Sequence, residues 1–239
     1  MVYLSVLITA LLAGVVQGVT GFGGGIITML IFPYFFSIPL GAGITGALGI
    51  ALCAFVALRY RKELNVRMAL MPAFLYIVVS SIVISFSTTM DPALIKKVFG
   101  AFLILLAAYY LFISKSVQNR KLSIGVSVVC IAISAACDAL FGIGGPLMVL
   151  YFMSMTRSTH EYLGTIQLFF WFNSMYNTTF RFYKGILLPE HLIFIAFGVI
   201  GILLGGVIAG KFVDKLNADT MRKLIYVMIG VSGVLNLLG

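Results

Sequence analysis

The stretch Gly21-Phe22-Gly23-Gly24-Gly25 interrupts an apolar run from residue 1 to 36. A similar stretch 121 residues later, Gly142-Ile143-Gly144-Gly145-Pro146, interrupts the run from 122 to 154. Glycine is a poor helix former and leaves the backbone bare, so each stretch predicts a break in an apolar helix. At membrane depth, non-helical backbone is tolerated only where protein buries it or where it lines a watery cavity. Two breaks at matching positions therefore predict a binding site.

The composition indicates a membrane protein. Of the 239 residues, 62% are hydrophobic and 10% are charged, and the mean hydropathy is +1.13. Soluble domains carry about 25% charged residues. Short loops separate the apolar runs, which span residues 1–36, 38–58, 68–87, 93–113, 122–154, 162–180, 188–210 and 224–238. We therefore expect an all-α polytopic membrane protein with a single transmembrane domain over residues 1–239.

Several other classes of protein and site are disfavoured. The first run lacks the basic leader and cleavage site of a signal peptide, so we expect it to remain in the protein. Cys53, Cys130 and Cys137 lie in apolar runs without metal-site spacing, so we interpret them as core residues and expect no metal or cofactor. The net charge of +9 comes from basic residues in short loops. Membrane topology and anionic lipids explain such residues better than nucleic acid does. The lipid bilayer is the expected partner, and the oligomeric state stays open.

The first run is too long for one membrane crossing. A helix over residues 1–36 would measure about 54 Å, against about 30 Å of bilayer hydrocarbon. Divided at the glycines, the run gives arms over residues 2–17 and 24–36, of about 24 and 20 Å. Each arm reaches past the midplane without crossing comfortably, so the segment must break or fold back.

The second half of the chain repeats this design. At the offset of 121, Gln17 matches Asp138 and Gly43 matches Gly164. With one inserted residue, Arg59 matches Arg181, and Lys62 likewise matches Lys184. The simplest interpretation is a pair of homologous repeats, about 1–113 and 122–239, joined by the polar linker 114–121.

Two topologies fit these repeats. If each glycine-broken segment is a re-entrant hairpin, each half adds three full transmembrane helices and the halves are inverted repeats. The alternative is eight full transmembrane helices in parallel halves. Hairpins place 12 of the 16 Lys and Arg residues inside, with Arg181 among those outside, whereas eight crossings place nine inside and seven outside. Because cytoplasmic loops are enriched in Lys and Arg, the charges favour inverted repeats with both termini outside.

The glycine breaks predict an anion site. If helices begin near Gly24 and Gly145, their free N–H groups and positive dipole ends point into the protein near the bilayer centre. Inverted repeats would bring these two helix starts face to face. The alternative is that the glycines only permit close helix packing. The residues predicted to form the site are Thr20, Gly21, Phe22, Gly23, Gly24, Gly25, Gly142, Ile143, Gly144 and Gly145.

The run from 162 to 180 has the most polar helical face. Gln167, Ser174, Asn177 and Arg181 recur at spacings that place them on one side of a helix. The amides of Gln167, Asn173 and Asn177 are candidate donors to an oxyanion, and Arg181 is expected to attract it toward the outer mouth. The alternative is that these amides only hold helices together.

Other polar and small residues need an explanation within the membrane. Asp138 is the only acid in its run, and burying it costs roughly 2.5–3.5 kcal/mol on insertion scales. We interpret Asp138 as a proton acceptor during transport, with a structural protonated acid as the alternative. Its counterpart Gln17 cannot titrate, so proton coupling would be asymmetric between the two halves.

The pair Lys96-Lys97 lies at a helix start and opposes the helix dipole, which points to lipid or partner contacts. A stripe of small residues predicts close helix packing and consists of Gly198, Gly201, Gly205 and Gly206.

These motifs are similar to those of a known family. Gly21 to Gly25, with Pro33 and the stretch Asn65-Val66-Arg67-Met68-Ala69-Leu70, resembles the sulfite exporter TauE/SafE family of membrane permeases. The second glycine stretch is similar to that family's repeated motif, with Pro146 in place of the third glycine; Pro suits the first turn of a helix. The resemblance spans nearly the whole chain. It implies transport of sulfur-containing oxyanions such as sulfite, sulfonates or thiosulfate, usually in a bacterial inner membrane, and fixes neither substrate nor direction.

We therefore expect a secondary transporter of a small anionic substrate and not an enzyme. A transporter of another small organic anion is the main alternative. A membrane-embedded enzyme would need clustered acids or a metal constellation, and the scattered acids of this chain provide none. An ion channel is disfavoured because the two hairpins would occlude the site from both sides.

Overall fold

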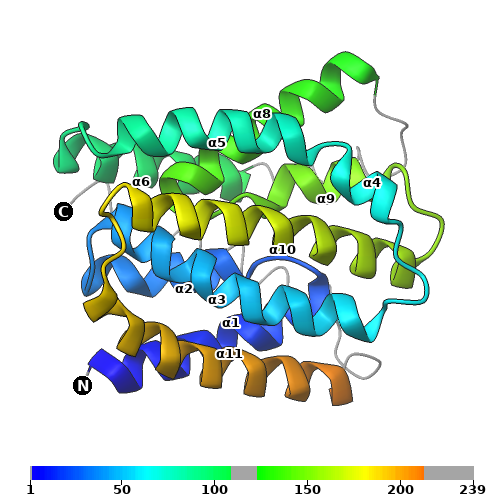
Figure 1. Ribbon diagram of the computed structural model, residues 1–239, viewed down its shortest axis with the longest axis horizontal. Coiled ribbons are helices and arrows are strands. Elements are labelled where there is room, and N and C mark those ends of the chain that lie inside the picture. The colour runs from blue at the N-terminus through cyan, green and yellow to red at the C-terminus, as the bar shows by residue number, and fades with distance from the viewer. Residues whose placement is uncertain (1, 109–122, 213–239) are drawn as a thin grey trace.

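Figure 1 shows a computed structural model of the chain, which describes residues 2–108 and 123–212. Every element in these ranges is helical: α1 Val2–Thr20, α2 Gly24–Ile31, η1 Phe32–Tyr34, α3 Ile38–Arg59, α4 Val66–Leu70, α5 Ala73–Ser87, α6 Pro92–Ala108, α8 Ile124–Phe141, α9 Gly145–Met153, α10 Thr159–Tyr183, η3 Pro189–His191 and α11 Leu192–Phe212. The expected all-α fold is confirmed for this part of the chain. The predicted linker 114–121 and the run 224–238 lie outside it.

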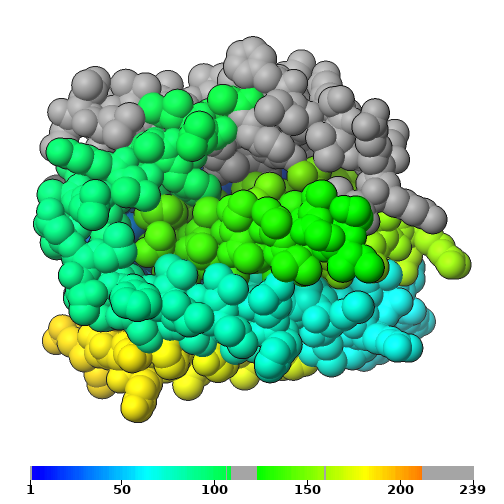
Figure 2. Space-filling view, turned by 90° about the horizontal axis from the view of Figure 1, so that it is seen from above, coloured from blue at the N-terminus to red at the C-terminus, as the bar shows by residue number. Residues whose placement is uncertain are grey.

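Five segments of the described chain are long and apolar enough to cross a membrane. They are Val2–Thr20, Ile38–Arg59, Val66–Ser87, Ile124–Phe141 and Pro189–Lys211. Figure 2 shows α8 at the surface of the molecule, beside α5. The exposed side chains on α8 include Ile124, Val126, Val128, Val129 and Ile133. Apolar surface of this extent fits contact with lipid.

The helices break where glycine was expected to break them. Helix α1 ends at Thr20 and α2 begins at Gly24, while α8 ends at Phe141 and α9 begins at Gly145. Gly21 and Gly23 adopt φ angles of +80° and +96°, and Gly142 adopts +65°. Side chains other than glycine rarely take this left-handed conformation, so the glycines fix the places where the chain turns. Helix α1 continues three residues past the predicted arm 2–17, which places Gln17 well inside it.

The first broken segment returns to the end of the molecule at which it began. The ring of Tyr3, near the start of α1, lies 5.1 Å from the ring of Phe194. The ring of Phe36, which follows η1, also lies 5.1 Å from Phe194. One residue of α11 therefore touches both ends of the segment. The chain folds back at the glycines, as the hairpin topology requires.

The second broken segment folds back in the same way at the opposite end. Ile124 and Ser127 at the start of α8, and Met155 just after α9, line one groove of about 530 Å³ together with Met71 and Pro72. Met71 and Pro72 lie between α4 and α5, in the part of the chain that follows the C-terminal end of α3. In Figure 1 the first hairpin opens toward the left, where the N-terminus is marked, and the second opens toward the right.

Helices α3 and α10 form an antiparallel pair between the hairpins. A Cβ atom added at Gly43, near the start of α3, would lie 3.0 Å from Leu187, just beyond α10. A Cβ added at Gly164, near the start of α10, would lie 2.9 Å from Leu64, just beyond α3. Gly43 and Gly164, which match in sequence, thus occupy equivalent places in the pair. Each lies near the start of its own helix and packs against the residues that follow the end of the other helix.

The predicted glycine stripe packs α11 closely between α1 and α3. A Cβ at Gly201 would contact the carbonyl oxygen of Leu7, and one at Gly205 would contact that of Leu11. The other two stripe glycines, Gly198 and Gly206, face Leu48 and Leu52 of α3. The prediction of close helix packing is confirmed. In the other half α8 packs along α5, so the first arm of each hairpin lies against a helix of the opposite half.

Candidate anion site

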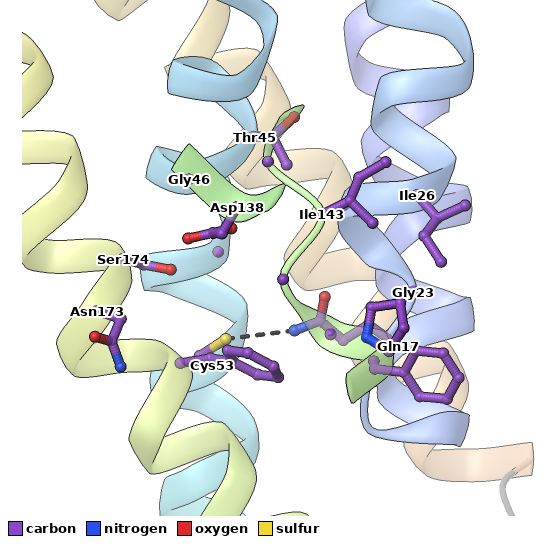
Figure 3. A pocket seen from close by; sticks show the side chains of 18 residues that line it. Gln17, Gly23, Ile26, Thr45, Gly46, Cys53, Asp138, Ile143, Asn173 and Ser174 are labelled. Carbon is purple, nitrogen blue, oxygen red and sulfur yellow. Dashed lines mark hydrogen bonds between the residues drawn. The ribbon is translucent and has the colours of Figure 1, made fainter. Parts of the chain in front are cut away.

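A cavity of about 60 Å³ lies between the two helix breaks (Figure 3). Its walls come from both breaks, from the starts of α2 and α9, and from the middle parts of α3 and α10. The predicted residues that line it are Gln17, Phe22, Gly23, Gly25, Asp138, Gly142, Ile143, Gly144, Gly145 and Asn173. The other predicted residues lie outside this lining and are Thr20, Gly21, Gly24, Gln167, Asn177 and Arg181.

The two breaks touch each other at this cavity. A Cβ atom added at Gly25, in the first turn of α2, would contact the carbonyl oxygen of Gly142. A Cβ added at Gly145, the first residue of α9, would lie 3.1 Å from Cβ of Phe22. No side chain caps the start of either helix. Two helix N-termini from opposite hairpins therefore meet at one cavity, and their N-cap residues, Gly23 and Gly144, have no side chain that could bind the first-turn amides.

Glutamine side chains hold the first break in place. Gln167 Nε2 on α10 donates to the carbonyl oxygen of Gly21 at 2.9 Å. Gln17 Nε2 donates to Gln167 Oε1 at 3.1 Å and approaches Cys53 Sγ at 3.3 Å, the contact dashed in Figure 3. Gln167 therefore supports the backbone of the break, while Gln17 links that support to the cavity wall. Cys53, interpreted above as a core residue, is buried and also lines the cavity.

Threonine hydroxyls bond to the backbone at the first break. Thr20 Oγ1 donates to the carbonyl oxygen of Phe22 at 2.6 Å. Thr28 Oγ1 donates to the carbonyl oxygen of Gly25 at 3.0 Å and accepts a hydrogen bond of 2.8 Å from Thr45 Oγ1. These local bonds fix the shape of the break and the start of α2.

The second break is held by a network that contains Asp138, the one acid among the cavity's lining residues in the part of the chain that the structure describes. Asn177 Nδ2 donates to Asp138 Oδ2 at 2.9 Å, and Ser80 Oγ donates to Asn177 Oδ1, also at 2.9 Å. Ser134 Oγ donates to the carbonyl oxygen of Gly144 at 2.8 Å, and the buried hydroxyl of Tyr76 donates to the Ser134 carbonyl at 3.4 Å. Asn177 thus orients the carboxylate and does not itself line the cavity.

The expectation that Arg181 attracts anions at the outer mouth is wrong. Arg181 is only 1% exposed, and its Nη2 donates to the carbonyl oxygens of Asp138 at 3.1 Å and Ala139 at 2.7 Å. These carbonyls belong to the last turn of α8, where a cation is favoured. In the ranges described, no Asp or Glu carboxylate lies within 4.0 Å of the guanidinium. The position of Arg181 near the end of an apolar run suggested a loop charge, but contact with α8 buries it.

Comparison with known proteins identifies the family. The family model described as Sulfite exporter TauE/SafE matches residues 6–235, nearly the whole chain. The chain belongs to the TauE/SafE family. Searches against curated proteins and against solved structures gave no match. This match confirms the resemblance found in the glycine motifs. Membership in the TauE/SafE family makes the chain a multi-pass membrane transporter and suggests sulfur anions as its cargo.

Some residues of this TauE/SafE site gave little signal in the sequence. Tyr76 and Ser134 lie in apolar runs, and only the need of a buried hydroxyl for a partner could have drawn attention to them. A Cβ added at Gly144 would contact the Tyr76 hydroxyl and lie 2.8 Å from Asp138 Cβ, so these groups enclose the start of α9.

Two buried polar atoms near the cavity keep unused hydrogen-bonding capacity. Asn173, a lining residue, donates Nδ2 to the carbonyl oxygen of Phe169 at 2.7 Å, but its Oδ1 has no partner within the described chain. Thr178 Oγ1 also has none, and it lies beside Gly46, another lining residue. Buried polar atoms are usually paired, so we expect a polar ligand or a water to bind these two atoms. Among the residues described, no group of three or more His, Cys, Asp or Glu could hold a metal ion.

Proposed function

We propose that this TauE/SafE protein is a secondary transporter of a small sulfur-containing oxyanion, such as sulfite, a sulfonate or thiosulfate, held between the starts of α2 and α9. The observation that carries the proposal is the contact between Gly25 and Gly142 at a cavity lined by both helix starts. The backbone amides around Gly24 and Gly145 donate to the anion. Thr20, Gly21, Gln167 and the other residues that hold the breaks keep these amides aligned.

Electrostatics support an anion as the ligand. Each helix N-terminus is equivalent to roughly +0.5 elementary charge, so two of them offer about one positive charge. The Arg181 guanidinium adds a buried cation beside Gly46 in the cavity wall. The carboxylate of Asp138 faces the same cavity. A proton on Asp138 would remove its negative charge, so proton and anion favour each other's binding and transport is proton-coupled.

We also assign the fold to two inverted repeats, about residues 1–113 and 122–239, joined by the linker 114–121. The opposite openings of the two hairpins support this assignment, as do the matching places of Gly43 and Gly164. Eight full crossings would put Tyr3 and Phe36 on opposite sides of the membrane, whereas both rings contact Phe194. The positive-inside rule supports a topology with both termini outside. We propose a bacterial inner membrane as the location, because that is the usual one implied by the family resemblance.

The size of the cavity favours a small cargo. A cavity of about 60 Å³ has space for only a few waters, since each water takes up about 30 Å³ in the liquid. An anion of four or five heavy atoms, such as sulfite or thiosulfate, is of this size, whereas a long organosulfonate would require the site to open.

Thermal unfolding of the purified protein tests the class of anion. Sulfite, thiosulfate, sulfoacetate and acetate are added separately. A ligand that binds only the folded state stabilises it by about 2.7 kcal/mol at a hundred times its Kd. We expect sulfite or thiosulfate to raise the unfolding temperature most. Stabilisation by acetate alone would favour the alternative of a carboxylate transporter.

Substitution at the contact between the breaks tests the site itself. In Gly25→Ala the added methyl group would meet the Gly142 carbonyl, which forces the two helix starts apart. We expect sulfite flux into proteoliposomes to fall by about ten-fold or more, since misplacement near 1 Å can cost about a hundred-fold in a positioned site.

The matched control is Gly125→Ala on α8, where no described atom lies within 4 Å of the added methyl group. Its flux should equal that of the wild type. Membrane content of both variants is measured by immunoblot. Undiminished flux in Gly25→Ala at normal protein content would reject the site between the breaks.

A further inference from the structure

A second cavity lies at the end of the molecule where the first hairpin opens. It has a volume of about 640 Å³. Three parts of the chain form its walls: the segment 33–40 from η1 into α3, the segment 87–96 from α5 into α6, and residues 184–186 after α10. These parts come together at the left of Figure 1. We call this cavity the lysine vestibule, because Lys96 and Lys184 line it.

The lysine vestibule is lined by positive charge, and no acid is among its lining residues in the described chain. Apart from Lys96 and Lys184, its lining residues within the described chain are uncharged, and Ser37, Ser87 and Thr88 add hydroxyl groups. The groove of about 530 Å³ at the opposite end has no charged lining residue in the described ranges. The two lysines therefore distinguish the lysine vestibule from the groove at the opposite end.

The two lysines differ in whether their surroundings stabilise a positive charge. Lys184 is the C-cap residue of α10, where a cation is favoured, and its Nζ lies 5.4 Å from the ring centroid of Phe180. Lys96 lies in the second turn of α6, near the positive end of that helix. It has no acidic partner within the described chain. An anion in the vestibule would provide the partner that Lys96 lacks.

Helix α10 connects the lysine vestibule with the cavity between the breaks. Lys184 and Arg181 are three residues apart and so lie on nearly the same face of the helix. Ser174, which lines the inner cavity, is ten residues before Lys184, or about 15 Å along the axis. Positive charge therefore continues from the vestibule to the buried guanidinium beside the inner site.

We propose that the lysine vestibule is a second anion-binding site, which captures the transported oxyanion before it moves to the inner cavity. This inference rests on the proposed function. An ammonium group binds an oxyanion through charge-assisted hydrogen bonds. The vestibule is much larger than the inner cavity, so the anion binds there with part of its hydration. A lipid phosphate offers the same chemistry, and the experiment separates the two sources.

The test measures initial rates of sulfite transport in proteoliposomes with sulfite added on one side or the other. The variants are Lys96→Gln, Lys184→Gln and the double variant. The matched control is Lys97→Gln, which removes a neighbouring exposed lysine that is not among the vestibule's lining residues.

Loss of both vestibule lysines should raise the KM for sulfite added on the vestibule side by about five- to ten-fold. This increase in KM should be smaller in high salt. The maximal rate, and the KM on the other side, should stay within about two-fold of the wild type, because the inner site is unchanged. An unchanged KM in the double variant, or an equal effect of Lys97→Gln, would overturn the proposal.

The lipid composition distinguishes the two sources of anion. The same rates are measured in vesicles of phosphatidylcholine alone and in vesicles that also contain phosphatidylglycerol. An equal rise in KM in both supports capture of the substrate. A rise only with phosphatidylglycerol assigns the lysines to lipid and overturns the proposal. Absence of sulfite flux in the wild type would refute the proposed function and this inference together, whereas wild-type flux with an unaltered KM in the variants refutes the inference alone.

Discussion

Asp138 matches Gln17 at the sequence offset of 121, yet only Asp138 can take up a proton. Its Oδ2 accepts a hydrogen bond from Asn177, and its carboxylate faces the cavity. In Asp138→Asn the shape is retained and the charge is lost. We expect sulfite flux to become independent of an imposed pH gradient, which vesicle transport assays with and without the gradient measure directly.

The control for this prediction is Asp91→Asn. Asp91 is exposed before α6, and its Oδ1 accepts from the amide of Ala93 at 3.2 Å. Flux through this variant should keep the dependence on the pH gradient. If flux through Asp138→Asn also kept it, Asp138 would not be the coupling residue.

Gln17 and Gln167 support the first break as a pair. Gln167→Leu leaves the Gly21 carbonyl without its donor and Gln17 without its acceptor. An unsatisfied buried polar group costs about 1–3 kcal/mol, so the free energy of unfolding should fall by about that amount. The measurement is denaturant unfolding in detergent of Gln17→Leu, Gln167→Leu and the double variant. The double variant should lose less than the sum of the single variants, and strict additivity would show that the two amides act independently.

At the scale of elements, the packing of α11 on α1 depends on glycine. A methyl group at Gly205 would contact the carbonyl oxygen of Leu11 and lie 2.8 Å from the amide nitrogen of Val15. Both neighbours are backbone atoms, so the helices must separate. Overpacking of this kind costs about 1–3 kcal/mol. Gly205→Ala should therefore lower the unfolding temperature, whereas Gly125→Ala on the exposed face of α8 should keep or raise it, because alanine is the better helix former. Equal unfolding temperatures would mean that α1 and α11 adjust without cost.

At the scale of the whole molecule, the proposed hairpin topology predicts which residues share a side of the membrane. Leu4 at the start of α1 and Tyr34 at the end of η1 are 63% and 66% exposed, and Lys62 after α3 is also exposed. Cys is placed at each position in a background whose native cysteines are replaced by Ala. An impermeant thiol reagent should label Leu4→Cys and Tyr34→Cys from one side and Lys62→Cys from the other. Labelling of Leu4→Cys and Tyr34→Cys from opposite sides would support eight full crossings.

The sequence by itself determined the features that depend on local preference. The break between α1 and α2 and the break between α8 and α9 could be predicted, because glycine's poor helix propensity acts on its own stretch of backbone. The polar face of α10 and the glycine stripe of α11 followed from helical periodicity alone. The duplicated motif was also sufficient to indicate the family.

The tertiary structure alone decided which side chain meets which. Gln167 and Asn177 were predicted to face an anion; in the structure Gln167 binds the Gly21 carbonyl and Asn177 binds Asp138. Arg181 was expected near the outer mouth, but the last turn of α8 binds it. The distance between the two breaks could not be predicted from the sequence, whereas the fold brings Gly25 against Gly142. The physical reason is that helix breaks are local, whereas the partner of a polar side chain depends on how distant helices pack.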